Sequence, residues 1–361
     1  MKEYLAIGLM SGSSLDGIDL VLTQLTSEDG RYHYTLLDAE TLPYPEPWRR
    51  QLADAFHAKP EELKSLDKRY GDYLGQCIRQ FVESRGVRPD FVASHGHTVF
   101  HKPAQRYTLQ IGDGQAIANR CGILTVNDFR SEDVRKGGQG APLVPIGDRL
   151  LFSEYELCLN IGGIANISYE QEGRRLAYDI CIANQALNTL AQREGLEYDR
   201  DGLLARSGQV NLQLLDKLNN HPYYQQTPPK SLGREFFERF QREELDGDST
   251  ANLLATFTEH IALQIAQSVN SQPQGKLLAT GGGAHNTYLI ERLQQHTHHK
   301  IVVPDRQTVD YKEALIFALL GLLRIEGHPN VLCSVTGAPS DTCGGQIWAP
   351  KKDYGNNLVR F

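Results

Sequence analysis

Three short segments rich in glycine have the features of turns that hold a ligand with their backbone. They are SGSSLDG at 11–17, NIGGIAN at 160–166 and TGGGAHN at 280–286. Each follows an apolar run that predicts a buried strand, and glycine lets the backbone approach a ligand closely. Consecutive N–H groups in such turns bind anions, and the third segment also leads into a predicted helix, whose N-terminus favours phosphate. Each segment alone is also compatible with a tight turn, but together they predict a bound nucleotide.

Histidine and cysteine residues occur in groups that raise the question of a metal or redox site. The segment SHGHTVFH at 94–101 places two histidines at a predicted strand end, which favours ligand binding over a metal, whereas HTHH at 296–299 is typical of a solvated loop. Zinc sites usually need a further cysteine or acid at suitable spacing. The six cysteines form no C-x-x-C pair, and several lie in apolar segments. We therefore expect reduced core thiols and no metal held by histidine.

The composition limits the classes of protein to which the chain can belong. The 361 residues suffice for two domains, and 40% hydrophobic and 22% charged residues are typical of a globular protein. A net charge of −7 gives no indication of nucleic acid or an anionic membrane. The apolar run at the start is too short for a signal peptide, and the run at 314–323 is too short for a bilayer. We expect a cytoplasmic protein, with 314–323 serving as core or as the interface of a homodimer.

The order of predicted elements repeats. A strand, turn, strand, strand and helix begin at Tyr4 and again about 150 residues later, at Leu157, and two of the glycine turns lie at matching points. The predicted strands are Tyr4–Met10, Gly17–Leu25, 32–40, 90–96, 107–112, 123–129, 157–161, 164–170, 174–184, 275–280 and 300–305. The predicted helices include Glu61–Ser84, 114–122, Gln185–Gln192, 286–293 and 311–327. In Glu61–Ser84 apolar residues recur at helical spacing, which predicts one buried face.

This alternation predicts an α/β fold with two related domains that flank a deep cleft. The first domain is expected at 1–145, with 335–361 as a candidate for completing it, and the second at 146–334. Glycines and prolines at 137–152 argue against regular structure at the junction. The chain contains no G-x-x-x-x-G-K-[ST] and no G-x-G-x-x-G, which excludes P-loop and Rossmann sites.

The chain resembles the superfamily of sugar kinases, actin and heat-shock ATPases, and within it the anhydro-N-acetylmuramic acid kinase family. The resembling segments are GLMSGSSLDGID, SHGHTVFHKP, TLQIGDGQAIA, VNDFRSEDVRKGGQGAPLVPIGD, LNIGGIANIS, PPKSLGREFF, TGGGAHN and KEALIFALLG. The resemblance implies two ribonuclease-H-like domains, ATP and Mg²⁺. It also implies that O6 of 1,6-anhydro-N-acetylmuramic acid is phosphorylated while water opens the anhydro bridge, in recycling of cell-wall peptidoglycan.

The resemblance also assigns roles to residues of this chain. Asp179 is the implied base, with helix capping as a weaker alternative, and Glu313 is either an acid near the sugar or a helix-start glutamate. Arg130 is implied to hold the lactyl carboxylate or else forms a surface ion pair, and Asp16 binds Mg²⁺ or forms an Asx turn. The residues implied to bind ATP are Gly12, Ser13, Ser14, Leu15, Asp16, Gly17, Ile18, Asp19, Asn160, Gly162, Gly163, Gly281, Gly282, Gly283 and Asn286. Those implied to bind the sugar are His97, Asp128, Arg130 and Asn184.

The chain departs from the family pattern after Asp179. The family usually continues with Thr-Gly-Pro, a small residue and Asn, whereas here Ile180, Cys181, Ile182 and Ala183 precede Asn184. We expect a bulkier and less polar loop beside the sugar. This leaves two alternatives open, a kinase of a different anhydro-amino sugar and a weakly active sensor of ATP and sugar. A filament-forming ATPase is a third, and Cys181 has no adjacent group to activate it as a nucleophile.

Overall fold

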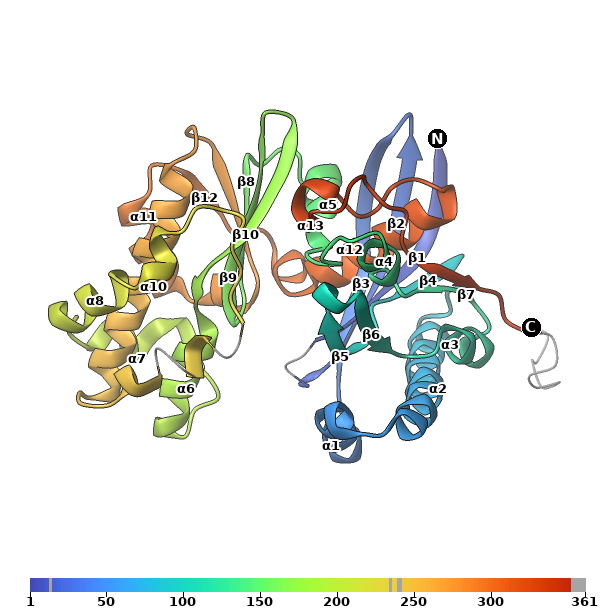
Figure 1. Cartoon of the computed structure of the whole chain (residues 1–361), viewed down its shortest axis with the longest axis horizontal. Helices are drawn as coiled ribbons and strands as arrows, with labels where there is room; N and C mark the ends of the chain where they lie inside the picture. The colour runs from blue at the N-terminus through green and yellow to red at the C-terminus, as the bar shows by residue number, and fades with distance from the viewer. Residues whose placement is uncertain (13–14, 234–235, 239–241, 352–361) are drawn as a thin grey trace. The chain divides into compact units, whose positions relative to one another are not determined.

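The structure is a computed structural model that describes residues 1–12, 15–233, 236–238 and 242–351 (Figure 1). The chain divides into two compact units. Unit 1 comprises Met1–Leu151 with Glu313–Phe361, and unit 2 comprises Phe152–Lys312. The first division lies close to the boundary expected at 145. The second lies inside helix α12 (Arg306–Glu326) rather than at 335, so most of this helix belongs to unit 1.

Unit 1 is built on a six-stranded sheet in the order β13-β7-β4-β1-β2-β3. These strands are β1 (Lys2–Ser11), β2 (Gly17–Glu28), β3 (Arg31–Pro43), β4 (Phe91–Ser94), β7 (Leu124–Asn127) and β13 (Gln346–Trp348). β1, β2 and β3 are antiparallel neighbours, whereas β4 runs parallel to β1 and β7 parallel to β4. A separate hairpin pairs β5 (His97–Lys102) with β6 (Tyr107–Ile111). Strand β5 is not among the predicted strands, because its mixed HTVFHK pattern follows Gly96 directly.

Helices cover both faces of this sheet. Ile7 and Leu9 of β1 share a core with the apolar face of α2 (Pro60–Arg85), as the periodicity predicts. Gly8 points the other way, since side chains alternate along a strand. A methyl group there would overlap the carbonyl oxygen of Ala314, and one at Gly321 would lie 2.7 Å from Cβ of Ala93. Helix α12 therefore lies against the opposite face at close range, which fixes the position of Glu313 in unit 1.

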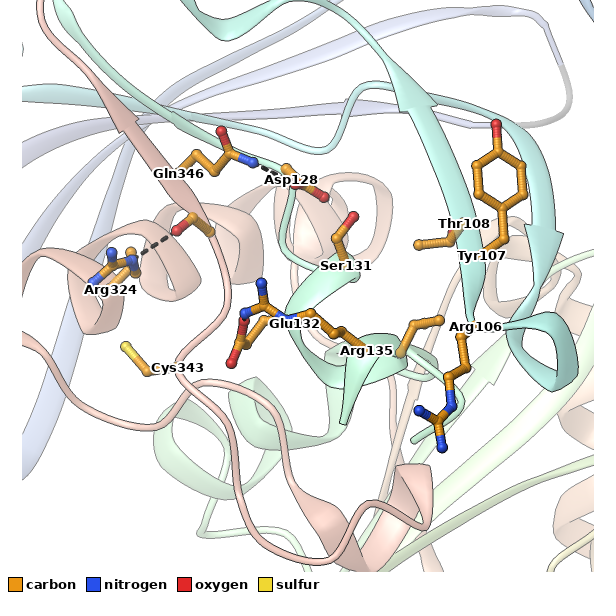
Figure 2. Close-up of a pocket in the computed structure, with 12 residues that line it drawn as sticks. Arg106, Tyr107, Thr108, Asp128, Ser131, Glu132, Arg135, Arg324, Cys343 and Gln346 are labelled. Atoms are coloured by element: carbon orange, nitrogen blue, oxygen red, sulfur yellow. Dashed lines mark hydrogen bonds and ion pairs between the residues drawn. The ribbon is translucent and has the colours of Figure 1, made fainter. Parts of the chain in front are cut away.

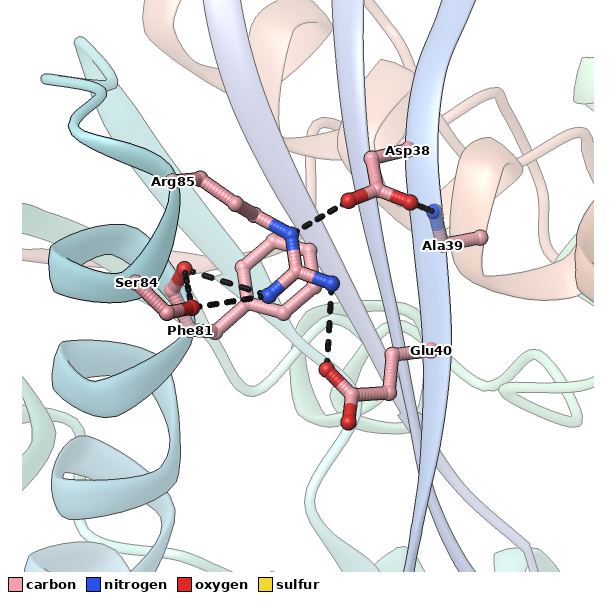
Figure 3. A network of polar contacts seen from close by, with 6 residues as sticks. All are labelled: Asp38, Ala39, Glu40, Phe81, Ser84 and Arg85. Carbon is pink, nitrogen blue, oxygen red and sulfur yellow. Dashed lines mark hydrogen bonds and ion pairs between the residues drawn. The ribbon is translucent and has the colours of Figure 1, made fainter.

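The C-terminal end of α2 is tied to the edge strand β3 by an arginine (Figure 3). The Arg85 guanidinium donates from Nε to Asp38 and from Nη2 to Glu40 at 3.1 Å, and it stacks 3.7 Å from the ring centroid of Phe81. Gly86 then ends the helix with a φ of 64°. Because the Arg85 side chain is only 22% exposed, this network is worth more than an ordinary surface ion pair.

The other helices of unit 1 are short. They are α1 (Glu46–Asp54), α3 (Gly114–Cys121), α4 (Ser131–Arg135), α5 (Val144–Leu151) and α13 (Cys333–Thr336), with 3₁₀ turns η1 (Ala55–His57) and η2 (Pro103–Gln105). The prediction of irregular structure throughout 137–152 is wrong, because α5 occupies its second half. Pro145 lies in the first turn of α5, where a missing N–H costs nothing.

Unit 2 repeats the architecture with a five-stranded sheet in the order β10-β9-β8-β11-β12. Its strands are β8 (Leu157–Ile161), β9 (Ile164–Gln171), β10 (Arg174–Ile182), β11 (Lys276–Thr280) and β12 (Lys300–Val302). The first three are antiparallel neighbours, and β11 and β12 run parallel to β8 and β11. Each unit thus has three antiparallel strands followed by parallel ones in the order 3-2-1-4-5, which is the ribonuclease-H-like arrangement. The predicted α/β repeat is confirmed.

Several helices of unit 2 pack on this sheet or on one another. They are α6 (Asn184–Ala191), α7 (Leu203–Ser207), α8 (Leu212–Asn219), α10 (Thr250–Asn270) and α11 (Thr287–His296), with 3₁₀ turns η3 (Gln192–Glu194), η4 (Arg200–Gly202), η5 (Pro222–Gln225), η6 (Arg242–Leu245) and η7 (Gly282–His285). The long helix α10 was not predicted. It is apolar on most sides and forms the centre of the unit 2 core, with Ser249 as its N-cap.

Two predictions about polar side chains need correction or qualification here. The segment HTHH is not a solvated loop, because His299 is buried with Nε2 2.8 Å from the carbonyl oxygen of Val269, and His296 lies 2.8 Å from Glu259.

The cysteines are free, as expected. Cys77, Cys158 and Cys181 are core residues, but Cys121, Cys333 and Cys343 are partly exposed. None of the described helices has the length and hydropathy of a membrane span.

Candidate functional site

The β8–β9 turn of unit 2 is fixed to the start of helix α6 by backbone hydrogen bonds. The N–H of Asn184 donates to the carbonyl of Gly162 at 3.1 Å, and that of Ala183 donates to the carbonyl of Gly163 at 2.8 Å. The Asn184 side chain also donates from Nδ2 to the carbonyl of Ile161 at 3.1 Å. The carbonyls of this turn therefore face α6, and the predicted residue Asn184 belongs to the same cluster.

The third glycine segment lies beside this turn. Gly281 follows β11 with a φ of 81°, and a Cβ there would lie 2.5 Å from Oδ1 of Asn160. Gly283 packs on Ile161, where a methyl group would clash with the side chain. Asn286 then begins helix α11, since its side chain accepts a hydrogen bond from the N–H of Leu289 at 3.0 Å. The structure thus brings the two predicted segments of unit 2 together.

Three glycines of this cluster have no structural reason to be glycine. Gly162, Gly163 and Gly282 all lie outside the left-handed region, and the nearest atoms to an added Cβ would be 3.5, 3.9 and 3.7 Å away. At the other glycines of residues 15–232 and 242–351, the added Cβ either lies closer than 3.0 Å to a neighbour or the φ is positive. A missing side chain that neither packing nor φ requires indicates that something outside the chain approaches the backbone. The glycines at these three positions therefore fit the close approach of a phosphate group.

A cavity of about 620 Å³ opens beside Gly282 within unit 2. Four predicted residues line it, namely Asn184, Gly282, Gly283 and Asn286. His285 of the same glycine segment also lines it, together with residues that the sequence did not indicate, namely Leu187, Asn188, Glu197, Tyr198, Asp199, Arg200, Asp201, Leu254, Thr258 and Arg306. The size falls in the range of small-molecule and cofactor pockets. The residues that the sequence did not indicate come from α6, from α10, from the start of α12 and from the connection at 197–201, and no motif in the sequence joins these segments.

The first glycine segment joins β1 to β2 in unit 1. Ser13 and Ser14 lie outside the described residues, and the strands pair as far as Ser11 and Ile18. Ile18 is fully buried, so only its backbone could contact a ligand. Asp16 is exposed, and its carbonyl accepts a hydrogen bond from the N–H of Tyr44 at 3.3 Å. Its neighbours Gly12, Leu15, Gly17 and Asp19 are partly buried, and Asp19 accepts from Thr41 at 2.6 Å.

The described residues do not form a metal centre of their own. No three His, Cys, Asp or Glu side chains among them come together in a way that could hold an ion. Mg²⁺ at a nucleotide uses only one or two protein carboxylates, with phosphate oxygens and waters as its other ligands. The exposed carboxylate of Asp16 fits this smaller requirement.

Asp179 lies in β10, at the point where a bulge interrupts its pairing with β9. Its carboxylate accepts a hydrogen bond from the N–H of Leu232 at 2.9 Å, and its carbonyl accepts from the hydroxyl of Tyr223 at 2.6 Å. Burial raises the pKa of Asp179 above its usual value, and the Leu232 hydrogen bond opposes the shift. The N-cap of α6 is Ala183, so the capping alternative for Asp179 is wrong.

Lys230 and Tyr223 support Asp179 and were not predicted individually. The N–H of Asp179 donates to the carbonyl of Lys230 at 3.2 Å, while Nζ of Lys230 donates to the carbonyl of Tyr223 at 3.3 Å. Burial lowers the pKa of Lys230. A signal was present in the sequence, because Lys230 and Leu232 both belong to the segment PPKSLGREFF.

The residues after Asp179 do not form the expected loop. Ile180, Cys181 and Ile182 continue strand β10, and with Ala183 they are at most 1% exposed within the unit 2 core. Burial raises the pKa of the Cys181 thiol, which makes it a poor nucleophile. The apolar substitutions in this segment therefore fill the core. The expectation of a bulkier loop beside the sugar is wrong.

In unit 1, Arg130 follows β7 and is held by polar partners on two sides. Its Nε and Nη2 lie 3.3 and 2.9 Å from Nε2 of His95, and its Nη1 donates to the carbonyl of Gly140 at 2.7 Å. Burial lowers the pKa of Arg130 to about 10, and the charge of Glu313 opposes this shift. Arg130 is only partly exposed and remains charged at neutral pH, and the partners that hold it are an imidazole and a backbone carbonyl.

Glu313 and His97, which are also predicted to lie near the sugar, belong to unit 1 like Arg130. Helix α12 begins at Arg306, so Glu313 lies about two turns inside it and is not a helix-start glutamate. His97 begins β5 and is buried, and its Nδ1 has no partner among the described residues. Burial also lowers the pKa of His97. Both side chains are thus placed by elements of unit 1.

Asp128 lines a cavity of unit 1 to which its neighbour Arg130 does not contribute. Figure 2 shows Asp128 with Gln346, whose Nε2 donates to Oδ2 of Asp128 at 2.9 Å. This cavity has a volume of about 640 Å³, and Arg130 does not line it. Asp128 has a φ of 58°, which turns the chain between β7 and α4. The structure therefore does not bring Asp128 and Arg130 into one pocket.

Two ribonuclease-H-like units, with a glycine turn bordering a cavity in one of them, define the class of sugar kinases and actin-like ATPases. Comparison with known proteins gives the family. Residues 4–350 match the model of the family described as anhydro-N-acetylmuramic acid kinase, and the chain belongs to this family. It is a family of kinases, which use ATP.

Curated relatives agree over nearly the whole chain. A protein of Mannheimia succiniciproducens is 36% identical over 377 residues, covering 96% of this chain and 99% of its own length. One of Gloeobacter violaceus is 37% identical, with 94% and 97% covered, and one of Vibrio cholerae is 36% identical, with 97% and 99% covered. All three are named anhydro-N-acetylmuramic acid kinase. Among solved structures, component A of (R)-2-hydroxyglutaryl-CoA dehydratase from Acidaminococcus fermentans is 12% identical with a TM-score of 0.46, covering 88% of this chain and 96% of its own.

Proposed function

We propose that this protein uses ATP to phosphorylate O6 of 1,6-anhydro-N-acetylmuramic acid while water opens the 1,6-anhydro bridge. The products are N-acetylmuramic acid 6-phosphate and ADP, and the reaction serves the recycling of cell-wall peptidoglycan. Family membership supports the substrate and the reaction. The single observation on which the mechanism rests is the partly buried carboxylate of Asp179, held by the N–H of Leu232 and raised in pKa.

The glycine turns bind the phosphates of ATP. Backbone groups at Gly162, Gly163 and Gly282 approach the phosphates, where the absent side chains leave room. Asn160, Gly281, Gly283 and Asn286 fix these turns, and the turn from Gly12 to Asp19 supplies the remaining phosphate contacts. Mg²⁺, when bound, neutralises phosphate charge, and Asp16 would hold it directly or through water.

Asp179 acts as the general base. It accepts a proton from water as the water oxygen attacks the anomeric carbon, the bond from that carbon to O6 breaks, and O6 takes the γ-phosphoryl group. Burial raises the pKa of Asp179, which makes its carboxylate a stronger base for this proton transfer. The hydrogen bond from Leu232 keeps one carboxylate oxygen in place.

Unit 1 supplies recognition of the sugar. Arg130 binds the lactyl carboxylate, because a guanidinium matches a carboxylate with two parallel hydrogen bonds. Glu313 balances the charge of Arg130 and contacts the sugar together with His97, and Asn184 of unit 2 contributes a further polar group. Asp128 is retained as a sugar residue on the family resemblance only, since it faces the cavity of Figure 2.

The competing readings lose their main support. A different sugar and a silenced sensor both rested on an altered loop at 180–183, and these residues are part of the unit 2 core. We further propose a homodimer and a cytoplasmic location, the latter because ATP is the co-substrate.

The test compares Asp179→Asn with a matched control. Asn keeps the shape of the side chain but takes up no proton, so kcat should fall about 100- to 10,000-fold while the KM for ATP stays within threefold of wild type. Asp90→Asn is the control, because the Asp90 carboxylate likewise accepts a backbone N–H, from Leu5 at 2.8 Å, and has no proposed part in the reaction. Turnover by Asp179→Asn within threefold of wild type would falsify the mechanism.

A further inference from the structure

Arg130 has more donors than its partners within the protein use. A guanidinium carries five N–H groups, one on Nε and two on each terminal nitrogen. The Nε–H and one N–H of Nη2 point to Nε2 of His95, and one N–H of Nη1 points to the carbonyl of Gly140. One N–H therefore remains on each of Nη1 and Nη2. Two such groups suit a two-point hydrogen bond to a carboxylate.

His95 is built into unit 1 as a rigid acceptor. It follows β4, and its N–H donates to the carbonyl of Leu9 at 3.0 Å. The hydroxyl of Ser11 donates to the carbonyl of the next residue, Gly96, at 2.7 Å. The imidazole is 6% exposed and packs 4.9 Å, centroid to centroid, from the ring of Phe317 on α12. The ring is thus held from the sheet on one side and from a helix on the other.

The protonation state of His95 follows from its surroundings. Nε2 faces two N–H groups of a cation, so it must carry a lone pair and the proton must lie on Nδ1. Burial and the charge of Arg130 lower the pKa of His95 to about 3, which keeps the ring neutral at physiological pH. Because its acceptor atom is already engaged, His95 does not itself bind the sugar. Its effect on a ligand passes through Arg130.

We propose that His95 is a positioning residue, whose neutral imidazole fixes one edge of the Arg130 guanidinium so that the two remaining N–H groups bind the carboxylate of the sugar. This inference rests on the proposed function, in which Arg130 binds the lactyl group. It adds a specificity role: His95 matters for sugars that carry the carboxylate and not for those without it. If His95 only filled space beside Phe317, its loss would affect both kinds of sugar equally.

The test uses two sugars and two variants. 1,6-Anhydro-N-acetylmuramic acid carries the lactyl carboxylate, and 1,6-anhydro-N-acetylglucosamine lacks it. In His95→Leu, we expect the KM for the first sugar to rise about 10- to 100-fold, the range for a lost charge-assisted hydrogen bond, with kcat within threefold. The kcat/KM for the second sugar and the KM for ATP should stay within twofold. His95→Gln, whose amide oxygen can replace Nε2, should recover most of the affinity.

A double-mutant cycle separates positioning from packing. In an Arg130→Ala background, His95→Leu should have no further effect on the KM for the carboxylate sugar, because both changes remove the same contact. His260→Gln is the control for loss of a buried neutral histidine, since His260 is buried in unit 2 with a pKa also lowered to about 3. It should lower the melting temperature without a change in sugar specificity. Equal losses for both sugars in His95→Leu, or additive effects in the cycle, would overturn the inference.

A spectroscopic readout keeps this inference separate from the proposed function. If the wild-type protein phosphorylates neither sugar, the proposed function has failed. ¹⁵N nuclear magnetic resonance of labelled histidine then tests the His95 assignment directly. We expect Nε2 to be unprotonated at pH 7 and its signal to move in Arg130→Ala. A protonated Nε2 at pH 7, or a signal that is unchanged by Arg130→Ala, would refute the positioning role.

Discussion

Two neighbouring glycines, Gly282 and Gly283, should respond in opposite ways to the same substitution. At Gly282 a new methyl group would have its nearest neighbour 3.7 Å away, at Nδ2 of Asn184, and φ is not positive. Replacement of glycine by alanine at such a position stabilises by about 0.4–1 kcal/mol, because the unfolded chain loses freedom. At Gly283 the methyl group would clash with Ile161, and overpacking of this kind costs about 1–3 kcal/mol.

These free energies translate into melting temperatures. For a unit of this size, 1 kcal/mol corresponds to about 2–4 °C. Gly282→Ala should therefore raise the melting temperature of the protein without nucleotide by about 1–4 °C, and Gly283→Ala should lower it by about 2–12 °C. Differential scanning fluorimetry without ligand measures both changes.

The affinity for nucleotide should not follow the change in stability. The methyl group of Gly282→Ala projects to the side where we place the phosphates, so the KM for ATP should rise at least tenfold although the protein is more stable. Isothermal titration with a non-hydrolysable ATP analogue checks the affinity, and ADP release checks the KM. The reasoning is refuted if Gly282→Ala destabilises the protein as much as Gly283→Ala does, or if it binds the analogue as tightly as wild type.

Three further predictions concern pH and packing. His95 and His260 have a pKa of about 3 in the folded state, against 6.5 as the ordinary value, so the unfolded chain binds more protons between these limits. Stability should therefore fall as pH falls from about 6.5 towards 3, by up to about 1.4 kcal/mol per pH unit for each histidine, and urea titrations of His260→Gln should show a shallower dependence; an unchanged slope would contradict this. In the pH profile of kcat, the midpoint of the acidic limb should lie above pH 3.8, the ordinary pKa of aspartate, because the pKa of Asp179 is raised. A midpoint at or below pH 3.8 would count against a buried base. Arg85→Ala should lower the melting temperature by several degrees through loss of the Asp38 and Glu40 contacts, whereas Arg50→Ala, which removes an exposed pair, should change it by less than about 2 °C.

Much of the fold could be predicted because its signals are local. The apolar alternation of β1 and the helical spacing in α2 follow from burial on one face, and the glycine turns marked the strand ends. Helix α10 was missed because a helix that is buried on most sides lacks the polar face that periodicity detects. Helix α5 is harder to predict because proline usually breaks a helix, although it is tolerated in a first turn.

The candidate site was only partly predictable for a different reason. Glycine turns and single charged residues can be recognised in sequence, but their partners come from distant segments. His95 and Gly140 hold Arg130 only after β4, β7 and the following connection have folded together. The segment at 180–183 shows the limit most clearly, because a departure from the family pattern gave no sign of whether it faced the ligand or the core.

The central claim, coupled ring opening and phosphoryl transfer, is tested most directly by the mass of the product. Purified protein is incubated with 1,6-anhydro-N-acetylmuramic acid, ATP and Mg²⁺, and ADP release is followed together with mass spectrometry of the sugar. We expect one ADP for each sugar consumed, and a product heavier than the substrate by one phosphoryl group plus one water. ATP hydrolysis without a phosphorylated sugar, or no turnover by a protein that still binds ATP, would contradict the account.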